Sequence, residues 1–211
     1  MTKIEQLVYF SKKLYSLGLV SGTSGNISFR DAEKATMWIT PSALPYDVMT
    51  VEDLVEIDLA TGETVTGHRK PSSEKPMHQS IYNRRENIGA IVHTHSTYAT
   101  MFACAGMEIP PVHYLLADIG DSVPIAPYAT YGSEELAQYA VEAMDNANGT
   151  LLQNHGVIAV GSDLLSAFQR AEIIENMAQL AWGASALGSL KLLSDKQMAE
   201  ARTGFSTYFP K

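Results

Sequence analysis

The sequence predicts a fold of the α/β class, a three-layer α/β/α arrangement around a central sheet that is mixed but mostly antiparallel. The first observation is a series of short β-branched or alternating runs in the first third of the chain. They follow one another with no helical pattern between them, which indicates an antiparallel meander. The second observation is that strand-like apolar runs alternate with helical patterns later in the chain. Together these favour one three-layer domain over a doubly wound parallel sheet.

The composition is that of an ordinary globular protein. The chain has 211 residues, 45% of them hydrophobic and 18% charged, so we expect residues 1–211 to form a single domain with a substantial core. The net charge of −8 argues against nucleic acid as the main partner, because phosphate backbones attract basic surfaces. An acidic protein can still bind a phosphorylated metabolite where a local site supplies hydrogen-bond donors.

No stretch indicates a membrane segment or a signal peptide. No apolar run approaches the ~20 residues that a membrane-spanning helix needs, and Met1–Glu5 does not begin a signal-peptide core. The single cysteine, Cys104, can form no intramolecular disulfide and fits a reducing compartment. We therefore expect a cytoplasmic protein with no membrane partner.

Periodicity and turn residues place the elements. Apolar residues recur at helical spacing from residue 3 to residue 17 and stop at Gly18. Ser72-Ser73-Glu74, followed closely by Pro76, is a helix N-terminal pattern. The expected helices span 3–17, 74 to 83 or 85, 97–105, 133–146 and 163 to about 187. The expected strands span 36–40, 54–59, 64–66, 88–92 and 150–160, the last broken at His155-Gly156, with a short extended segment at 123–128.

Two histidines stand one residue apart at the end of a predicted buried strand. Side chains on a strand alternate between its faces, so His93 and His95 should project side by side. His155 lies at a similar strand break, and Glu74 opens a predicted helix. Each of these residues also has an ordinary structural interpretation, and Glu74 alone is more simply a complement to the helix dipole.

Three imidazoles and one carboxylate suit a catalytic Zn²⁺, which uses few protein ligands and keeps one position free. Iron, cobalt, nickel or manganese could occupy the same donor set. A Schiff-base lysine would need a desolvated amine. The lysines of this chain all lie in polar stretches, which favours metal chemistry over an imine.

Two segments offer donors for an anion. The run Ser21–Phe29 is rich in glycine and small polar residues, whose backbone amides can approach a ligand closely, although a plain connection explains it as well. The helix that begins near Glu74 presents free amides beside the hydroxyls of Ser72 and Ser73. Taken alone, His78 is more simply a packing residue than a ligand. Tyr114, an aromatic residue in an apolar segment, is more simply a half-buried core residue.

Several separated motifs, taken together, resemble the class II aldolase/adducin family over nearly the whole chain. They occur in the same order and at similar spacing as in that family, and they are most similar to aldolases of the L-fuculose 1-phosphate type. The motifs are Gly25-Asn26-Ile27-Ser28, Ser72-Ser73-Glu74, His93-Thr94-His95, His113-Tyr114 and Gln153-Asn154-His155-Gly156.

The resemblance implies a zinc-dependent aldolase that cleaves a ketose 1-phosphate reversibly to dihydroxyacetone phosphate and a short aldehyde such as L-lactaldehyde. It implies that His93, His95 and His155 hold the metal and that Glu74 is both a labile fourth ligand and the acid/base. It assigns Tyr114 to a neighbouring subunit's site, with Tyr208 in a similar role, within a homotetramer whose sites lie between subunits. The implied phosphate-binding residues are Gly25, Asn26, Ser42, Ala43, Ser72 and Ser73.

Two departures from the family leave the substrate open. Ala43 stands where these aldolases usually have glycine, and Lys75-Pro76 stands where the L-fuculose type has an aromatic residue and an arginine. One alternative is an epimerase of the ribulose-5-phosphate 4-epimerase type, although that relative carries aspartate where this chain has Glu74. A methylthioribulose-1-phosphate dehydratase and a non-enzymatic adducin-like module are weaker alternatives.

Overall fold

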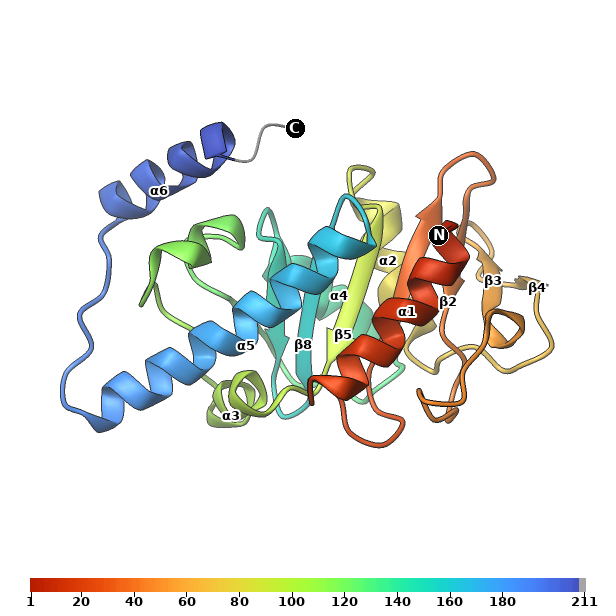
Figure 1. Ribbon diagram of the computed structural model, residues 1–211, viewed down its shortest axis with the longest axis horizontal. Helices are drawn as coiled ribbons and strands as arrows, with labels where there is room; N and C mark the ends of the chain where they lie inside the picture. Colours follow the sequence, from red (N-terminus) through yellow and green to blue (C-terminus); the bar gives the residue numbers. More distant parts are fainter. Residues whose placement is uncertain (209–211) are drawn as a thin grey trace.

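A computed structural model, which describes residues 1–208, contains one eight-stranded sheet in the order β4-β3-β2-β1-β5-β8-β7-β6 (Figure 1). All neighbouring strands are antiparallel except β6 and β7, so the expected mixed, mostly antiparallel sheet is confirmed. The expected meander comprises β2, β3 and β4, and β1 extends it by one strand. The strands are β1 Asn26–Asp31, β2 Thr36–Ile39, β3 Val55–Asp58, β4 Thr64–Thr66, β5 Ala90–Thr94, β6 Ile125–Ala126, β7 Gly149–Leu152 and β8 Gly156–Gly161.

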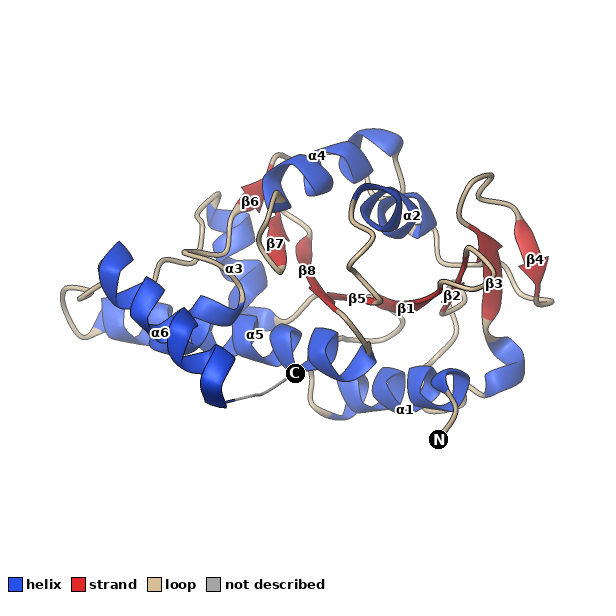
Figure 2. Ribbon diagram, turned by 90° about the horizontal axis from the view of Figure 1, so that it is seen from above, coloured by secondary structure: helices blue, strands red, loops and turns tan. Residues whose placement is uncertain are grey.

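Helices cover both faces of this sheet, which confirms the three-layer architecture. Figure 2 shows α2 and α4 on one face and α1 and α5 on the other. Each side has its own apolar core, and the pleat of β5 divides its residues between them: Ile91 packs with the α2 and α4 side, whereas Val92 packs with the α1 and α5 side. The helices are α1 Lys3–Ser16, α2 Lys75–Arg84, α3 Thr97–Ala105, α4 Glu134–Met144, α5 Leu164–Ala186 and α6 Asp195–Tyr208, with 3₁₀ turns at Val51–Asp53 and Tyr114–Asp118.

Five helices agree with the sequence-based spans within a residue or two. Their ends carry the expected signals: Thr2 and Asp163 cap α1 and α5 through their side chains, and Gly106 ends α3 in a left-handed conformation. Within residues 1–208, none of the helices combines the length and the apolar character that crossing a membrane would require.

The structure differs from the sequence-based expectation in two segments. The run of small residues up to Phe29, interpreted as a loop, becomes strand β1 from Asn26 onward. Its polar residues Asn26 and Ser28 are buried against α2. Because both faces of β1 are buried there, the strand lacks the usual alternation of buried and exposed side chains. Helix α6 was not expected, because its sequence is polar and has only weak helical periodicity.

Candidate metal centre and substrate cavity

The three histidines and Glu74 reach one place from three parts of the chain. His93 lies near the end of β5, a central strand flanked by β1 and β8. Thr94 of β5 pairs with Val157 of β8, so the β7–β8 turn that carries His155 lies at the same end of the sheet as His95. Glu74 occupies the N-cap position of α2, one of the two helices that cover one face of the sheet.

The ring nitrogens of the histidines face one another and the carboxylate. His93 Nε2 lies 3.0 Å from His95 Nε2 and 2.8 Å from Glu74 Oε2, while His155 Nε2 lies 3.2 Å from Glu74 Oε1. The three imidazole centroids are 4.8, 4.9 and 5.0 Å apart, a nearly equilateral arrangement of rings steeply inclined to one another. One donor atom from each of the four residues fits within 4.8 Å of the others.

The backbone around the rings is shaped for this convergence. A Cβ at Gly156 would collide with the carbonyl of Thr94 and would come within 3.0 Å of the His95 ring and 3.3 Å of the His93 ring. The His-Gly break between β7 and β8 therefore leaves room for the two rings of β5. His93 Nδ1 lies 3.0 Å from the carbonyl of Val157 and can only donate to it, which aims Nε2 at the cluster.

Burial and mutual charge set different protonation states within the cluster. Burial, together with the charges of neighbouring histidines, lowers the pKa of His95 to about 3 and that of His155 to about 4. Burial would also lower the pKa of His93, but the Glu74 carboxylate outweighs it and raises that pKa. Burial would raise the pKa of Glu74, yet His93, His155 and the Asn26 amide hold it well below its usual range.

This donor set fits a divalent transition metal ion. Neutral imidazole nitrogens and a carboxylate are the ligands such ions take, and a steep inclination between the rings is compatible with tetrahedral coordination. Glu74 Oε1 is buried and has no hydrogen-bond partner among the described residues. A buried carboxylate oxygen without a hydrogen bond is costly, and a bound cation would remove that cost.

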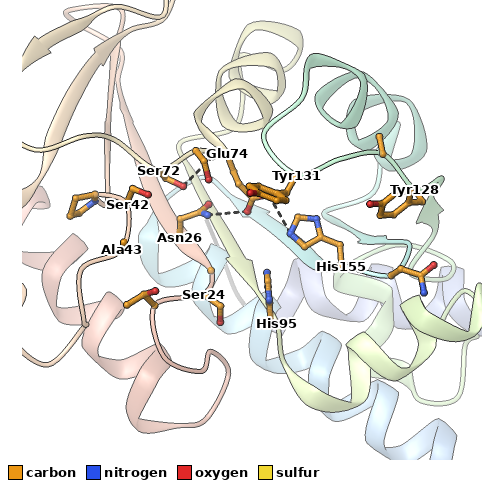
Figure 3. A pocket seen from close by; sticks show the side chains of 16 residues that line it. Ser24, Asn26, Ser42, Ala43, Ser72, Glu74, His95, Tyr128, Tyr131 and His155 are labelled. Carbon is orange, nitrogen blue, oxygen red and sulfur yellow. Dashed lines mark hydrogen bonds and ion pairs between the residues drawn. The ribbon is translucent and has the colours of Figure 1, made fainter.

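A cavity of about 310 Å³ opens beside the cluster (Figure 3). Glu74, His95 and His155 line it, so the donor set is accessible to a small ligand. The six residues that the family resemblance assigns to phosphate binding all line the same cavity, although they come from three separate loops. These residues are Gly25, Asn26, Ser42, Ala43, Ser72 and Ser73.

Tight turns build this side of the cavity. Gly25 and Ala43 both have left-handed backbone conformations, with φ of 75° and 56°. A Cβ at Gly25 would lie 2.7 Å from the carbonyl of His93, so this glycine allows the loop to approach β5 closely. Ser42 N donates to the Lys70 carbonyl and Ser72 N to the Thr40 carbonyl, which fastens the two serine turns to each other.

One predicted catalytic residue, Tyr114, does not line the cavity within one chain. Tyr114 begins a 3₁₀ turn with 52% of its surface exposed and stacks on Phe205 of α6, so it is not the half-buried core residue that the residues alone suggested. The side chain of Tyr208 lies outside the described part of the structure.

Sequence reasoning missed several residues around the site. Tyr128, Tyr131 and Asn154 also line the cavity, and Figure 3 draws both tyrosines among its lining side chains. His78 was expected to be a packing residue and not a ligand; it is fully buried, and in addition both of its ring nitrogens are hydrogen-bonded. The signal that could have revealed it is the four-residue spacing of Glu74, His78 and Tyr82, which places all three on one face of a helix.

Comparisons with known proteins show the family to which the chain belongs. The profile of the family described as Class II Aldolase and Adducin N-terminal domain matches residues 5–182. A 5-deoxy-D-ribulose 1-phosphate aldolase of Bacillus thuringiensis serovar kurstaki is 43% identical over 97% of this chain and 95% of its own length. A 5-methylthioribulose-1-phosphate/5-deoxyribulose-1-phosphate aldolase of Rhodospirillum rubrum is 37% identical, covering 96% of this chain and 90% of the relative.

The fold of this chain is also similar to that of a solved relative. The solved structure of an L-fuculose 1-phosphate aldolase superposes with a TM-score of 0.94 and 40% identity, covering 97% of this chain and 96% of that one. The profile match spans all the residues that form the cluster and line the cavity. The chain therefore belongs to the class II aldolase and adducin family, and it is a metal-dependent aldolase.

Proposed function

We propose that this aldolase reversibly cleaves the C3–C4 bond of a ketose 1-phosphate to give dihydroxyacetone phosphate and a short aldehyde. The observation that carries the proposal is the position of Glu74. One of its carboxylate oxygens is buried without a hydrogen bond, beside His155. Both residues line the same cavity as the six candidate phosphate ligands. A proton donor and a phosphate site in one small cavity suit a small phosphorylated sugar.

His93, His95, His155 and Glu74 would hold the metal ion, for which we propose Zn²⁺ because the set of three histidines and one displaceable carboxylate suits a catalytic zinc site. The ion would supply a Lewis acid for the C2 carbonyl and C3 hydroxyl oxygens of the ketose. His93 is fully buried and its Nδ1 is engaged by the Val157 carbonyl, so its ring orientation is fixed before substrate binds.

Asn26, Ser42, Ser72 and Ser73 would donate side-chain hydrogen bonds to the substrate phosphate. The backbone amides of Gly25 and Ala43 would add donors from turns in a left-handed conformation. Phosphate would also lie near the N-terminus of α2, whose partial positive charge favours an anion. These donors would hold the phosphate so that the reacting carbons lie within reach of Glu74, which lines the same cavity.

Glu74 would carry the proton between the two sides of the reaction. When the C3–C4 bond breaks, its electron pair stays on C3, and the C4 hydroxyl gives its proton to the ionised Glu74 carboxylate, so that C4 becomes the aldehyde carbon. The Glu74 carboxyl delivers a proton to C3, which completes dihydroxyacetone phosphate, and in the reverse direction it removes that proton. The Tyr114 hydroxyl of a neighbouring subunit would stabilise the C4 oxygen, with Tyr208 in a supporting role.

Those tyrosine roles require an assembly. We propose a homotetramer with sites between subunits, in which residues 1–211 form a single catalytic domain. The exposed position of Tyr114 supports this proposal, because an exposed aromatic with a hydroxyl is available to reach a second copy of the chain.

Two substrates deserve direct comparison. L-fuculose 1-phosphate is favoured by the solved relative with a TM-score of 0.94, and it would yield L-lactaldehyde. A 5-deoxyribulose 1-phosphate is favoured by the relative at 43% identity, and its cleavage would yield acetaldehyde. Both sugars carry a methyl group at the end remote from the phosphate, so the proposal covers one substrate class.

The test is an assay of both sugars with the Zn²⁺-loaded protein and with Glu74→Gln. We expect dihydroxyacetone phosphate from at least one sugar. We also expect Glu74→Gln to retain metal and lose roughly 10²–10⁴-fold in turnover, the range of a general acid/base. Interconversion of pentulose 5-phosphates without dihydroxyacetone phosphate would favour the epimerase, and near-normal cleavage by Glu74→Gln would refute the proton-transfer role.

A further inference from the structure

A row of buried polar side chains lies between β1 and α2, directly behind Glu74. The helix contributes Glu74, His78 and Tyr82, one residue from each successive turn of one face. The strand contributes Asn26 and Ser28, two residues apart on one side of β1. All five side chains are buried, although apolar residues surround them on the same face of the sheet.

Hydrogen bonds connect these five residues in one continuous chain. The Tyr82 hydroxyl lies 2.8 Å from Ser28 Oγ, which lies 2.7 Å from His78 Nδ1. His78 Nε2 lies 2.6 Å from Asn26 Oδ1, and Asn26 Nδ2 donates to Glu74 Oε2 over 3.1 Å. Figure 3 shows the last of these bonds, from the Asn26 amide to the carboxylate.

The hydrogen bonds that connect these five residues have a single consistent direction of donation. An ionised carboxylate only accepts, so the Asn26 amide must present its NH₂ to Glu74 and its oxygen to His78. His78 Nε2 must therefore carry a proton, and Nδ1 accepts from the Ser28 hydroxyl, which in turn accepts from Tyr82. Burial lowers the pKa of His78 to about 3, in agreement with a neutral ring with one donor and one acceptor nitrogen.

We propose that His78 is a positioning residue that locks the orientation of the Asn26 amide and, through it, the Glu74 carboxylate at the metal centre. The proposal rests on the proposed function of the Glu74 site and deepens it. Without the Nε2 donor, the Asn26 amide can rotate and place its oxygen against Oε2, where two acceptors repel each other. Ser28 acts one step further back, because its hydroxyl selects the ring tautomer that keeps the proton on Nε2.

The position of Asn26 extends the effect to substrate. Asn26 Nδ2 has two hydrogens, one of which points to Glu74, and the residue also lines the cavity. The second hydrogen is free for an anionic ligand, so a single locked amide orients the carboxylate and the phosphate donor together. Burying five polar side chains costs more desolvation free energy than burying apolar ones would. This cost favours a role for the network beyond packing.

The test is a double-mutant cycle on metal affinity, measured by titrating metal-free protein with Co²⁺ and following its visible absorption. We expect His78→Leu to weaken Co²⁺ binding about 10–100-fold, as loss of a residue that orients a metal ligand does. In a Glu74→Ala background the same substitution should change binding less than about threefold, because the group it positions is gone. His78→Gln, which restores a donor near the Nε2 position, should recover most of the affinity.

Equal losses in both backgrounds, or no loss in the first, would overturn the proposal. Should His78→Leu lose its fold, Ser28→Ala carries the same cycle with an expected weakening of about fivefold, the value of one hydrogen bond. Ser11→Ala is the matched control: it removes a buried hydroxyl in α1, on the other face of the sheet, and should leave Co²⁺ affinity unchanged. No substrate is present, so failure of the proposed aldolase reaction would not alter the result.

Discussion

The histidine cluster and the phosphate side of the cavity are neighbours built by different means. The cluster uses ordinary strand geometry: His93 occupies a paired position in β5, and the antiparallel partner β8 brings His155 alongside. The phosphate side uses three loops whose backbones enter the left-handed region at Gly25 and Ala43. The paired strands fix the positions of the histidines. The positions of the phosphate-binding groups depend instead on a few residues with an unusual backbone conformation.

This difference predicts two kinds of failure. Changes in the cluster should abolish metal binding without abolishing the fold, because the ladder persists when a side chain is removed. Changes at the turns should act first on backbone conformation and only then on ligand affinity.

His93→Ala should cause the largest change. It removes the most buried of the three candidate metal-binding imidazoles. We expect metal affinity to fall about a thousandfold or more, because only three of the four donor residues remain. Metal content after dialysis and calorimetric titration measure this. His68→Ala is the control, because His68 is exposed outside the site. Retention of one tightly bound ion per chain in His93→Ala would contradict the donor set.

Gly25→Ala should damage folding rather than metal chemistry. Its Cβ would lie 2.6 Å from Val20 Cγ1 and 2.7 Å from the His93 carbonyl. We expect the free energy of unfolding to fall by about 3 kcal/mol, from left-handed strain and overpacking combined. Gly22→Ala is matched, with φ of 60° but nothing within 4 Å, and should cost only about 1 kcal/mol. Denaturant unfolding of both variants would show equal losses if close approach did not matter.

Metal affinity should rise with pH over a defined window. The pKa of His93 is raised above the ordinary 6.5, so in the metal-free protein this ring is protonated at and below that pH. His155 stays neutral down to about pH 4. Between these limits metal uptake should release about one proton, so affinity should increase about tenfold per pH unit and level off above the His93 pKa. Calorimetry in buffers of different ionisation enthalpy measures the proton. A pH-independent affinity in that window would show that His93 is already neutral.

Ala43→Gly should have the smallest effect. Alanine at φ of 56° is strained, so glycine should increase the free energy of unfolding by about 0.5–1 kcal/mol. It should also lower KM for the sugar phosphate about twofold, because the amide can approach the phosphate more closely. Ala35→Gly, at φ of 53° in the β1–β2 turn, should give the same stability gain and no change in KM. Equal KM effects in both variants would remove Ala43 from the phosphate site.

The sequence predicted the cluster better than its surroundings, for physical reasons. Two-residue alternation along a strand is local, so His93 and His95 could be placed on one face from sequence alone. The approach of His155 depends on the pairing of β5 with β8, which no local pattern specifies; a similar strand break suggested it, and the family resemblance supported it. The left-handed backbone at Ala43 has no local signal beyond the glycine that related proteins usually have there.

The hydrogen-bonded row of polar residues behind Glu74 could not be predicted from local sequence patterns. Asn26 and His78 are 52 residues apart and meet only because β1 packs beneath α2. Each residue alone has an ordinary interpretation, and its role appears only when the hydrogen bonds are followed end to end. Tyr114 marks a different limit, because its proposed partner belongs to another copy of the chain.

The most direct measurement is X-ray absorption at the zinc edge of the Zn²⁺-loaded protein, repeated with His155→Ala. We expect three imidazole nitrogens at ~2.0–2.1 Å from a single ion, and one fewer in the variant. A site with the same number of imidazoles in both proteins, or one dominated by other ligands, would contradict the assignment of His93, His95 and His155 as the residues that hold the metal.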